Sequence, residues 1–347
     1  MKVAHIMAGA PVGGAELFFE RLCVALHDAG DDVLPLIRAD APRAARLSSA
    51  GLPVEQFGFG GALDLATRRR LRHSLRRFAP RVAVAWMNRA ARLAPVGDWA
   101  LVGRLGGFYD LGYYRRCDHL VGNTRGIVDY VRQQGWPPAR AHYLPNFAPD
   151  FAPNFAPTFA HARPTRPELP SGAKLVLALG RLHPSKGFDV LIGAVAKLPG
   201  VHVLIAGEGP ERDALTGLAR REGVADRVHL PGWVQNPSGL LAACDALACP
   251  SRLEPLGNVV LDAWSASRPV VAAAAAGPVE LIAPGEDGLL VPCDDPAALA
   301  QSLALVLDHA PLAARLAASG RARYDADFAT EPVLARWRAF LATVEKA

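Results

Sequence analysis

Short apolar runs of strand length alternate with amphipathic stretches of helix length along almost the whole chain, which limits the possible folds more than any other feature. The alternation is typical of α/β proteins, in which helices cover both faces of a parallel sheet. It occurs as two series. Strand-like runs lie at residues 3–7, 32–37, 81–86, 100–102 and 119–122, and again at 174–179, 201–206, 228–230, 246–249 and 269–273. The sequence therefore predicts two Rossmann-like, doubly wound parallel-sheet domains.

The chain length of 347 residues accommodates two such domains. Helices are expected at residues 15–27, 187–197, 210–221, 258–266, 296–307, 312–320 and 331–344. The last of these lies beyond anything that the second sheet needs. We assign residues 1–146 to an N-terminal domain and residues 171–329 to a C-terminal domain.

The alternation stops between the two series. Four near-copies of one tetrapeptide begin there, at Asn146, Asp150, Asn154 and Thr158, and three of them end in proline. Proline at this density is incompatible with a helix or a central strand, so an extended, polyproline-like linker is predicted at residues 147–170. Its phenylalanines either pack against the body of the protein or recognise a partner.

Composition narrows the class of protein. Lysine and arginine number 38 against 33 aspartates and glutamates, and the net charge of +5 favours an anionic substrate or surface without indicating nucleic-acid binding. The five cysteines lack C-x-x-C spacing, so neither a disulfide framework nor a zinc site is indicated and a reducing compartment fits best. No run approaches the ~20 apolar residues of a membrane span. We expect a cytoplasmic protein that is not integral to a membrane.

Two cations follow the first strand of the second series, in the segment Leu179-Gly-Arg-Leu-His-Pro-Ser-Lys-Gly187. In open α/β sheets, ligands bind beyond the carboxyl ends of the strands, so Arg181 and Lys186 are expected to project into a crevice and meet an anion. The alternative is a pair of solvated surface charges that flank the start of a helix.

A second motif runs from Pro250 to Trp264. A strand places Glu254 at the sheet edge, and Gly257 then opens a helix whose free backbone N–H groups suit a phosphate. Asp262 lies on the second turn of that helix. One carboxylate is suited to sugar hydroxyls and the other to a ribose diol. The alternative is an acidic residue that caps the helix and a second one present by chance.

Glycine-rich turns follow a strand in both series. The turn at residues 8–16 contains Gly13 and Gly14, and backbone can approach a ligand closely there. It is not G-x-G-x-x-G and no Walker lysine follows, which disfavours a dinucleotide dehydrogenase or a P-loop enzyme. Gly207-Glu-Gly-Pro210 repeats the arrangement and is a weaker signal.

With these motifs in this order, the chain resembles the family-4 retaining glycosyltransferases of the GT-B fold, most strongly from Lys174 to Pro292. The resemblance is carried by Gly13-Gly-Ala-Glu16, Gly180-Arg-Leu182, Lys186-Gly187, Gly207-Glu-Gly-Pro210, Pro250-Ser251, Glu254, Gly257, Asp262 and Asp287-Gly-Leu-Leu-Val-Pro292. It implies two domains facing across a cleft. It also implies that the final helix, residues 330–347, crosses back to the N-terminal domain.

The resemblance also implies roles for these residues. Arg181 and Lys186 would neutralise the diphosphate of a nucleotide-sugar donor, with backbone amides from Gly257 and Asn258. Glu254 would hold the transferred sugar and Asp262 the nucleotide ribose. The loop of Gly232 and Trp233 would lie near the base, and Gly13 and Gly14 would reach toward phosphate or acceptor. No cofactor or metal is expected, and the one D-x-D, at Asp325 and Asp327, is given no metal role.

The chain departs from the family at two places. The E-x7-E pattern ends in Asp262, one methylene shorter than glutamate, which puts the ribose contact in doubt. A histidine often found in the first domain is missing, and Tyr109 or Asp110 takes its place or nothing does. His119 is expected to be a strand residue with a satisfied side chain.

Residues 68–81 form a predicted amphipathic helix with seven arginines, from Arg68 to Arg81, opposite a stripe of Leu71, Leu75 and Phe78. A basic helix of this kind can lie on anionic lipid, and lipid-linked acceptors are common in the resembled family. The alternative is a solvated helix face.

The expected function is therefore transfer of a hexosyl unit from a nucleotide-diphospho-sugar to a glycan or lipid-linked acceptor in lipopolysaccharide, capsule or other glycoconjugate assembly. Two other functions remain open on the sequence, a nucleotide-sugar epimerase of the GT-B fold and a catalytically silent nucleotide-sugar-binding partner. The silent reading is favoured by Asp262 and the missing histidine and opposed by intact Arg181, Lys186 and Glu254.

Overall fold

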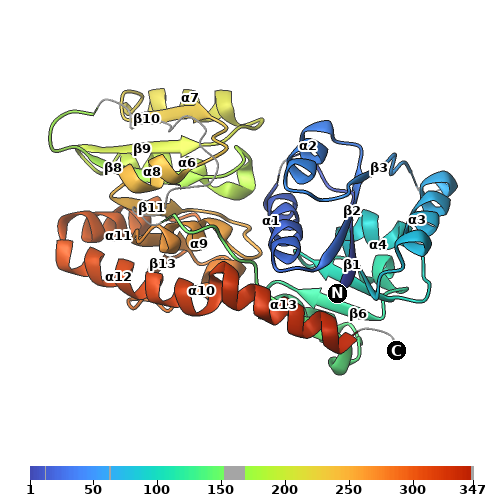
Figure 1. Cartoon of the computed structure of the whole chain (residues 1–347). Helices are drawn as coiled ribbons and strands as arrows, with labels where there is room; N and C mark the ends of the chain where they lie inside the picture. Colours follow the sequence, from blue (N-terminus) through green and yellow to red (C-terminus); the bar gives the residue numbers. More distant parts are fainter. Residues whose placement is uncertain (12, 62–63, 152–168, 345–347) are drawn as a thin grey trace. The chain divides into compact units, whose positions relative to one another are not determined.

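The computed structural model of the chain describes residues 1–11, 13–61, 64–151 and 169–344. The chain forms two compact units (Figure 1): unit 1 comprises Met1–Phe147 with Thr330–Ala347, and unit 2 comprises Ala148–Ala329. Each unit contains one sheet of parallel strands. The strands of both sheets are mostly buried on both faces, which is why they read as near-continuous apolar runs in the sequence.

The sheet of unit 1 has seven strands in the order β3-β2-β1-β4-β5-β6-β7. Their bounds are β1 Lys2–Met7, β2 Asp32–Arg38, β3 Glu55–Phe57, β4 Val82–Trp86, β5 Ala100–Leu105, β6 His119–Gly122 and β7 Ala141–Tyr143. Every pair is parallel. The strand order reverses beside β1, and such switch points are where open α/β sheets bind ligands.

Helices cover both faces of this sheet. One face packs against α1 (Gly14–Asp28), α2 (Ala41–Ser49) and α13 (Thr330–Val344), and the other against α3 (Leu65–Phe78), α4 (Met87–Leu93) and α5 (Arg125–Gln133). The short helices η1 (Leu111–Tyr114) and η2 (Pro138–Arg140) lie in the connections.

The helix α13, from the opposite end of the chain, completes the core of unit 1. Trp337 is fully buried and stacks on Trp86 of β4, with ring centroids 6.4 Å apart. Val333 and Leu341 are buried in the same cluster. The final helix, which was not required to cover the second sheet, therefore packs against the sheet of unit 1, as the resemblance implied.

The sheet of unit 2 has six strands in the order β10-β9-β8-β11-β12-β13, all parallel. Their bounds are β8 Lys174–Leu179, β9 Val201–Ala206, β10 Val228–Gly232, β11 Ala246–Cys249, β12 Val270–Ala273 and β13 Leu289–Val291. The order reverses beside β8, which has β9 on one side and β11 on the other. This switch point positions the loops described below.

The helices of unit 2 also form two layers. One face of the sheet packs against α6 (Phe188–Val195), α7 (Arg212–Arg221) and α11 (Pro296–Asp308), and the other against α8 (Ser238–Ala243), α9 (Asn258–Ser265) and η4 (Tyr324–Phe328). The remaining helices are η3 (Pro184–Lys186), α10 (Ala276–Leu281) and α12 (Ala310–Arg323).

The break between the units falls within the first copy of the tetrapeptide repeat. Phe147 is buried in unit 1, with its ring 5.1 Å from that of Phe18, whereas Ala148 is buried in unit 2. Most of the predicted linker, residues 152–168, lies outside the described residues.

One predicted helix is shorter than expected. The basic helix α3 ends at Phe78 because Ala79 adopts a left-handed conformation, with φ of 51°, and Arg81 then precedes β4. The helix thus carries six of the seven arginines. Leu71 and Leu75 are buried, as the stripe predicted.

Considered singly, no helix among the described residues is both long and apolar enough to cross a membrane. One pair, Pro296–Asp308 with Ala310–Val344, reaches the required length and composition only jointly and is bent by 98°.

Candidate functional site

Two predicted site residues meet at the switch point of unit 2. Lys186 ends η3, which follows β8, and Glu254 follows the neighbouring strand β11. Lys186 Nζ donates a hydrogen bond to Glu254 Oε2 over 2.6 Å, and Ser251 Oγ lies 3.3 Å from the same oxygen. The two ion-paired side chains are only 25% and 11% exposed. A fixed cation and a fixed carboxylate therefore lie together at the carboxyl edge of the sheet.

The loops that carry this pair touch through backbone atoms. Gly187 has φ of +64°, and a Cβ there would lie 2.0 Å from the carbonyl oxygen of Pro250. The backbone N–H groups of Arg252 and Leu253 both donate to the carbonyl of Ser185, over 2.9 and 3.1 Å. Only glycine at 187 permits this approach. In the motif Lys186-Gly187, the glycine is therefore required for packing and the lysine provides the charge.

Arg252, for which no role was predicted, fastens the same two loops. Its guanidinium donates two hydrogen bonds to Asp189, over 2.8 and 2.6 Å, and one to the carbonyl of Pro184 over 2.8 Å. It also pairs with Asp294. Paired N–H groups on a carboxylate fix direction as well as distance, so Arg252 holds η3 against the loop that carries Glu254. No signal in the sequence indicated this role, because the partners Asp189 and Asp294 of this half-buried arginine are distant from it in the chain.

Arg181 lies on the same edge but is exposed, and no hydrogen bond or ion pair of its side chain occurs among the described residues. Its neighbours are fixed by a second close backbone contact. A Cβ on Gly207 would lie 1.7 Å from the carbonyl oxygen of Gly180, and Leu182 N donates to the carbonyl of Glu208 over 2.9 Å. The turn at residues 207–210, which was the weaker sequence signal, thus packs against the segment that carries Arg181 and fixes its backbone.

The N-terminus of α9 adjoins Glu254. Gly257 caps the helix in a left-handed conformation with φ of +93°, and a Cβ there would lie 3.7 Å from Glu254 Cγ. Gly277 N donates to the carbonyl of Glu254 over 2.7 Å, which fixes the loop from the other side. The predicted residues Glu254, Gly257 and Asn258 are therefore brought together at a helix end with no side-chain cap.

The other donor-side predictions lie farther along these elements. Asp262 is half-buried on α9 and makes the smallest contribution to raising the pKa of Tyr324, after burial itself, Asp150 and Asp325. Gly232 ends β10 with φ of +94°, and Trp233 follows it with 46% of its surface exposed. An exposed indole at the carboxyl edge is available for stacking on a planar ligand.

The glycine-rich loop of unit 1 follows β1 and is shaped by Glu16. The carboxylate of this buried residue accepts a hydrogen bond from Ala10 N over 2.8 Å. A Cβ on Gly9 or Gly13 would lie 2.1 or 2.3 Å from its two oxygens. Gly14 begins α1 and is exposed. No role was predicted for Glu16 from the sequence. Its carboxylate leaves no room for a Cβ at residues 9 and 13, which explains why glycines recur in this loop.

Arg104, near the carboxyl end of β5, is buried at the start of the segment in which the family's histidine is missing. Its guanidinium lies over Trp86 and Phe18, 4.9 and 5.5 Å from the ring centroids, and donates to Asn146 Oδ1. Burial lowers the pKa of Arg104 to about 10, so it stays charged at neutral pH. The carbonyl of Tyr109 accepts from Tyr130 Oη over 2.9 Å.

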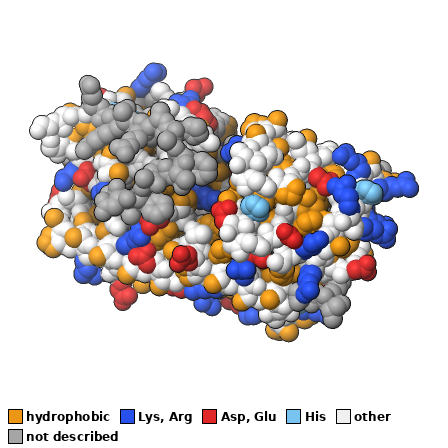
Figure 2. Space-filling view, viewed as in Figure 1, with side chains coloured by type: hydrophobic (Ala, Val, Ile, Leu, Met, Phe, Trp, Pro, Cys, Tyr) orange, Lys and Arg blue, Asp and Glu red, His pale blue; other side chains and the backbone are white. Residues whose placement is uncertain are grey.

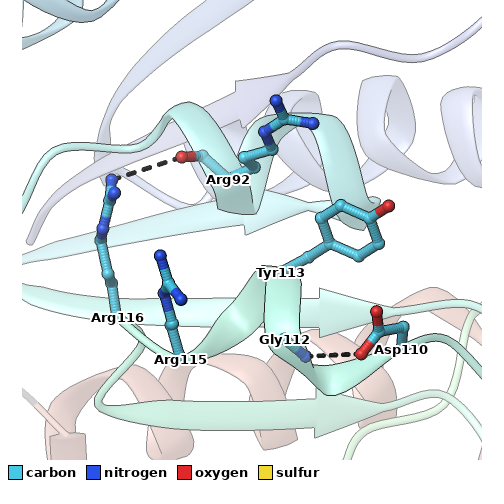
Figure 3. Close-up of a pocket in the computed structure, with 6 residues that line it drawn as sticks. All are labelled: Arg92, Asp110, Gly112, Tyr113, Arg115 and Arg116. Atoms are coloured by element: carbon cyan, nitrogen blue, oxygen red, sulfur yellow. Dashed lines mark hydrogen bonds between the residues drawn. The ribbon is translucent and has the colours of Figure 1, made fainter. Parts of the chain in front are cut away.

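The two acceptor-side candidates have different surroundings. Tyr109 is partly buried beside Gly106 and Gly107, whereas Asp110 caps η1 by accepting from Gly112 N over 2.8 Å and lines a cavity (Figure 3). His119 begins β6, and its Nδ1 lies 3.0 Å from His142 Nε2. It is thus a strand residue with a hydrogen-bonded ring, as predicted.

Among the described residues, no three side chains of histidine, cysteine, aspartate or glutamate gather in a way that suits a metal ion. Asp325 of the D-x-D lies in η4 and pairs with Arg321 of α12.

Comparison with known proteins decides the family. The sequence profile of the glycosyl transferases group 1 family matches residues 173–309. The lipopolysaccharide core biosynthesis glycosyltransferase LpsE of Rhizobium meliloti (strain 1021) is 34% identical over 346 residues, 99% of each chain. The chain belongs to the group 1 glycosyltransferases. Lipopolysaccharide core biosynthesis glycosyltransferase LpsD of the same strain is 35% identical over 331 residues, 92% of each chain.

Solved structures agree with this glycosyltransferase in fold. Anabaena HepE in complex with UDP-glucose has a TM-score of 0.83 at 21% identity and covers 99% of this chain and 100% of its own. The lipopolysaccharide outer core galactosyltransferase WaaB has a TM-score of 0.73 at 17% identity, with 99% of each chain covered. The predicted family, the two Rossmann-like domains of the GT-B fold and the glycosyltransferase class are therefore confirmed.

Proposed function

We propose that this glycosyltransferase transfers a hexosyl unit, with retention of anomeric configuration and without a metal, from a nucleotide-diphospho-sugar to a glycan or lipid-linked acceptor. The observation that carries the proposal is the ion pair of Lys186 and Glu254 at the switch point of unit 2, beside the N-terminus of α9. It places a cation, a carboxylate and helix amides where an open α/β sheet binds its ligand.

The reaction needs positive charge near the leaving group. When the bond between the anomeric carbon and the phosphate oxygen breaks, negative charge accumulates on the diphosphate. Lys186, Arg181 and the amides of Gly257 and Asn258 would stabilise that charge more in the transition state than in the ground state. Lys186 is already held in place by Glu254, so little reorganisation is required.

Glu254 has an oxygen left for the sugar. Its Oε2 contacts both Lys186 and Ser251, while no hydrogen bond reaches Oε1 from the described residues. We assign Oε1 to a hydroxyl of the transferred hexose. Asp262 is assigned to the nucleotide ribose and the loop of Gly232 and Trp233 to the base. On the acceptor side, unit 1 offers Gly13, Gly14, Tyr109 and Asp110.

The relatives support a proposal for the pathway and the donor. Because LpsE and LpsD are named lipopolysaccharide core biosynthesis glycosyltransferases, we propose an acceptor from lipopolysaccharide or a related glycoconjugate. HepE is described in complex with UDP and with UDP-glucose, which makes UDP-hexoses the first donors to test.

We also propose that the enzyme acts in the cytoplasm, peripherally on the inner face of the membrane, through α3. Figure 2 shows lysine and arginine side chains gathered over this helix. Arg70 lies over Phe57 and Arg77 pairs with Glu55, but Arg69 and Arg76 are exposed. Co-sedimentation with anionic liposomes should be lost at high salt. Salt-independent binding, or none, would remove this part of the proposal.

The transfer itself is tested by product analysis. The enzyme is incubated with a labelled UDP-hexose, with and without truncated lipopolysaccharide acceptor, and in the presence of a chelator. We expect a product glycan only with acceptor, with the anomeric configuration of the donor, and undiminished by the chelator. Conversion of donor alone into an isomeric nucleotide sugar would instead identify an epimerase.

A further inference from the structure

A cavity in unit 1 is lined mainly by arginines. It has a volume of about 250 Å³ and lies between α4 and the segment of η1. Its lining comprises Arg92, Asp110, Gly112, Tyr113, Arg115 and Arg116. Figure 3 shows Arg115 and Arg116 extending from the segment after η1 toward α4, which carries Arg92. None of these arginines belongs to a motif that the glycosyltransferase family explained.

The arginines of the cavity outnumber its one acidic residue and form no ion pair among the described residues. Among the described residues, no carboxylate oxygen lies within 4.0 Å of the guanidinium nitrogens of Arg92, Arg115 or Arg116. Arg116 instead donates to the carbonyl oxygen of Arg92 over 3.4 Å. The one acidic residue of the lining, Asp110, uses Oδ1 to cap η1. Three like charges around one hollow repel each other and favour an anion in it.

The same field extends to α3. Arg68 of this helix is half-buried, and its Nε is buried without a hydrogen-bond partner among the described residues. Burial lowers its pKa, and the charges of Arg116 and Arg72 lower it further. A fourth guanidinium is therefore destabilised by its neighbours, and a bound anion would relieve the repulsion.

We propose that the cavity lined by Arg92, Arg115 and Arg116 binds a phosphate group. Three guanidinium groups offer forked N–H donors that match the oxygens of a phosphate. A phosphate monoester carries about −1.5 to −2 charges and three strong acceptor oxygens, and so neutralises three cations more closely than a single carboxylate does. The ring of Tyr113, 36% exposed, offers a surface to the carbon skeleton that bears the phosphate.

Two sources could supply this group, a phosphorylated saccharide or a phospholipid head group. The first test uses the full chain and calorimetric titration with glucose 6-phosphate, with glucose as the uncharged control ligand. The double variant Arg115→Gln/Arg116→Gln should weaken binding of the phosphorylated sugar at least about tenfold, the loss of more than one charged hydrogen bond. The matched control Arg69→Gln/Arg76→Gln, which removes two charges from α3, should bind as the unaltered protein does.

The second arm replaces the sugar with vesicles of phosphatidylcholine and phosphatidic acid, whose head group is a phosphate monoester. Vesicle binding that is lost in Arg115→Gln/Arg116→Gln but kept in Arg69→Gln/Arg76→Gln would identify a lipid head group as the source. Loss in the α3 variant alone would assign the vesicle contact to α3 and leave the cavity to the soluble ligand. Thermal unfolding of each variant confirms that it is folded.

A third variant separates this cavity from the donor site. Because the cavity lies wholly in unit 1, Lys186→Ala in unit 2 should leave binding of glucose 6-phosphate unchanged even where it abolishes transfer. The proposal is overturned if neither probe binds saturably, if binding is equal in the cavity double variant and the unaltered protein, or if Lys186→Ala alone removes it.

Discussion

The two sheet edges that carry the predicted site residues use glycine in different ways. In unit 2, Gly187, Gly207 and Gly277 each face backbone atoms of a neighbouring loop, at 2.0, 1.7 and 2.4 Å from an added Cβ. In unit 1, Gly9 and Gly13 face only the side chain of Glu16. A backbone carbonyl held in a loop cannot move aside, whereas a carboxylate can rotate. The edge of unit 2 is therefore a rigid frame, and the loop of unit 1 can adapt.

This difference suits a division of labour. In the proposed function a donor diphosphate is the same group in every turnover, so fixed charges at the edge of unit 2 would need no adjustment and would stabilise the leaving group without reorganisation. An acceptor varies between related enzymes, and a loop shaped by one side chain can be altered without disturbing a backbone contact. The following substitutions test the comparison.

Among the substitutions that test this comparison, Gly187→Ala should have the largest effect. It adds a Cβ 2.0 Å from the Pro250 carbonyl and forces alanine to a φ of +64°, so Lys186 must shift. Turnover should fall on the order of 100-fold, as expected for a displacement near 1 Å. Gly200→Ala is the matched control because Gly200 has a φ of +71° and nothing within 4 Å. Equal turnover in the two variants would show that the close contact is not required.

The acid sensitivity of unit 1 gives the next largest effect. His5 is fully buried and accepts from Trp86 Nε1, and burial lowers its pKa from 6.5 to about 3. The unfolded chain therefore binds the proton first, and this stability, present above pH 6.5, is lost as pH falls toward 3. Between pH 7 and 5 the unaltered protein should lose about 2 kcal/mol more than His5→Asn, measured by denaturant unfolding. The control His73→Asn, at an exposed position, should lose as much stability between pH 7 and 5 as the unaltered protein does.

A double-mutant cycle probes whether the loop of unit 1 adapts. Gly13→Ala should destabilise the protein, since the added Cβ would lie 2.3 Å from Glu16 Oε2. Combination with Glu16→Ala should recover stability, with a coupling free energy of about 1 kcal/mol in denaturant unfolding. Strict additivity of the two substitutions would mean that Glu16 does not set the shape of the loop.

The smallest effect is expected for Arg252→Lys in the frame of unit 2. Lysine keeps the charge but cannot make the paired hydrogen bonds to Asp189, so η3 loosens against the loop of Glu254. We expect kcat/KM for the donor to fall about fivefold, equivalent to roughly 1 kcal/mol. Arg220→Lys, on the exposed face of α7, serves as the control. An unchanged kcat/KM in Arg252→Lys would deny the fastening role.

The sequence predicted the edge of unit 2 better than that of unit 1, for a physical reason. A glycine that faces backbone atoms cannot be replaced, so it stands out in the sequence. Gly187 is such a glycine, and it lies next to the predicted site residue Lys186 in the chain. In unit 1, by contrast, Arg104 lies over Trp86 and Arg116 contacts Arg92. These contacts join segments that are distant in the chain, so no local sequence motif indicates them. Short strands such as Ala141–Tyr143 and Leu289–Val291 escaped prediction because three residues show no periodicity.

The sequence also placed the end of the basic helix too late. Its apolar stripe continues in register through Phe78, but Ala79 adopts a left-handed conformation and Pro80 follows it. Pro80 disfavours a helical conformation at Ala79, so the sequence itself contained the stop signal and the predicted helix should have ended before it.

The central claim is that Lys186, fixed by Glu254, stabilises the diphosphate leaving group. It is tested most directly by steady-state kinetics of Lys186→Ala with the donor identified by product analysis. Lys197→Ala, at an exposed lysine of the same unit, is the control. We predict a fall in kcat of about 100- to 1000-fold with unchanged thermal unfolding. A kcat within about twofold of the unaltered enzyme, well outside the range for loss of such a group, would contradict the account.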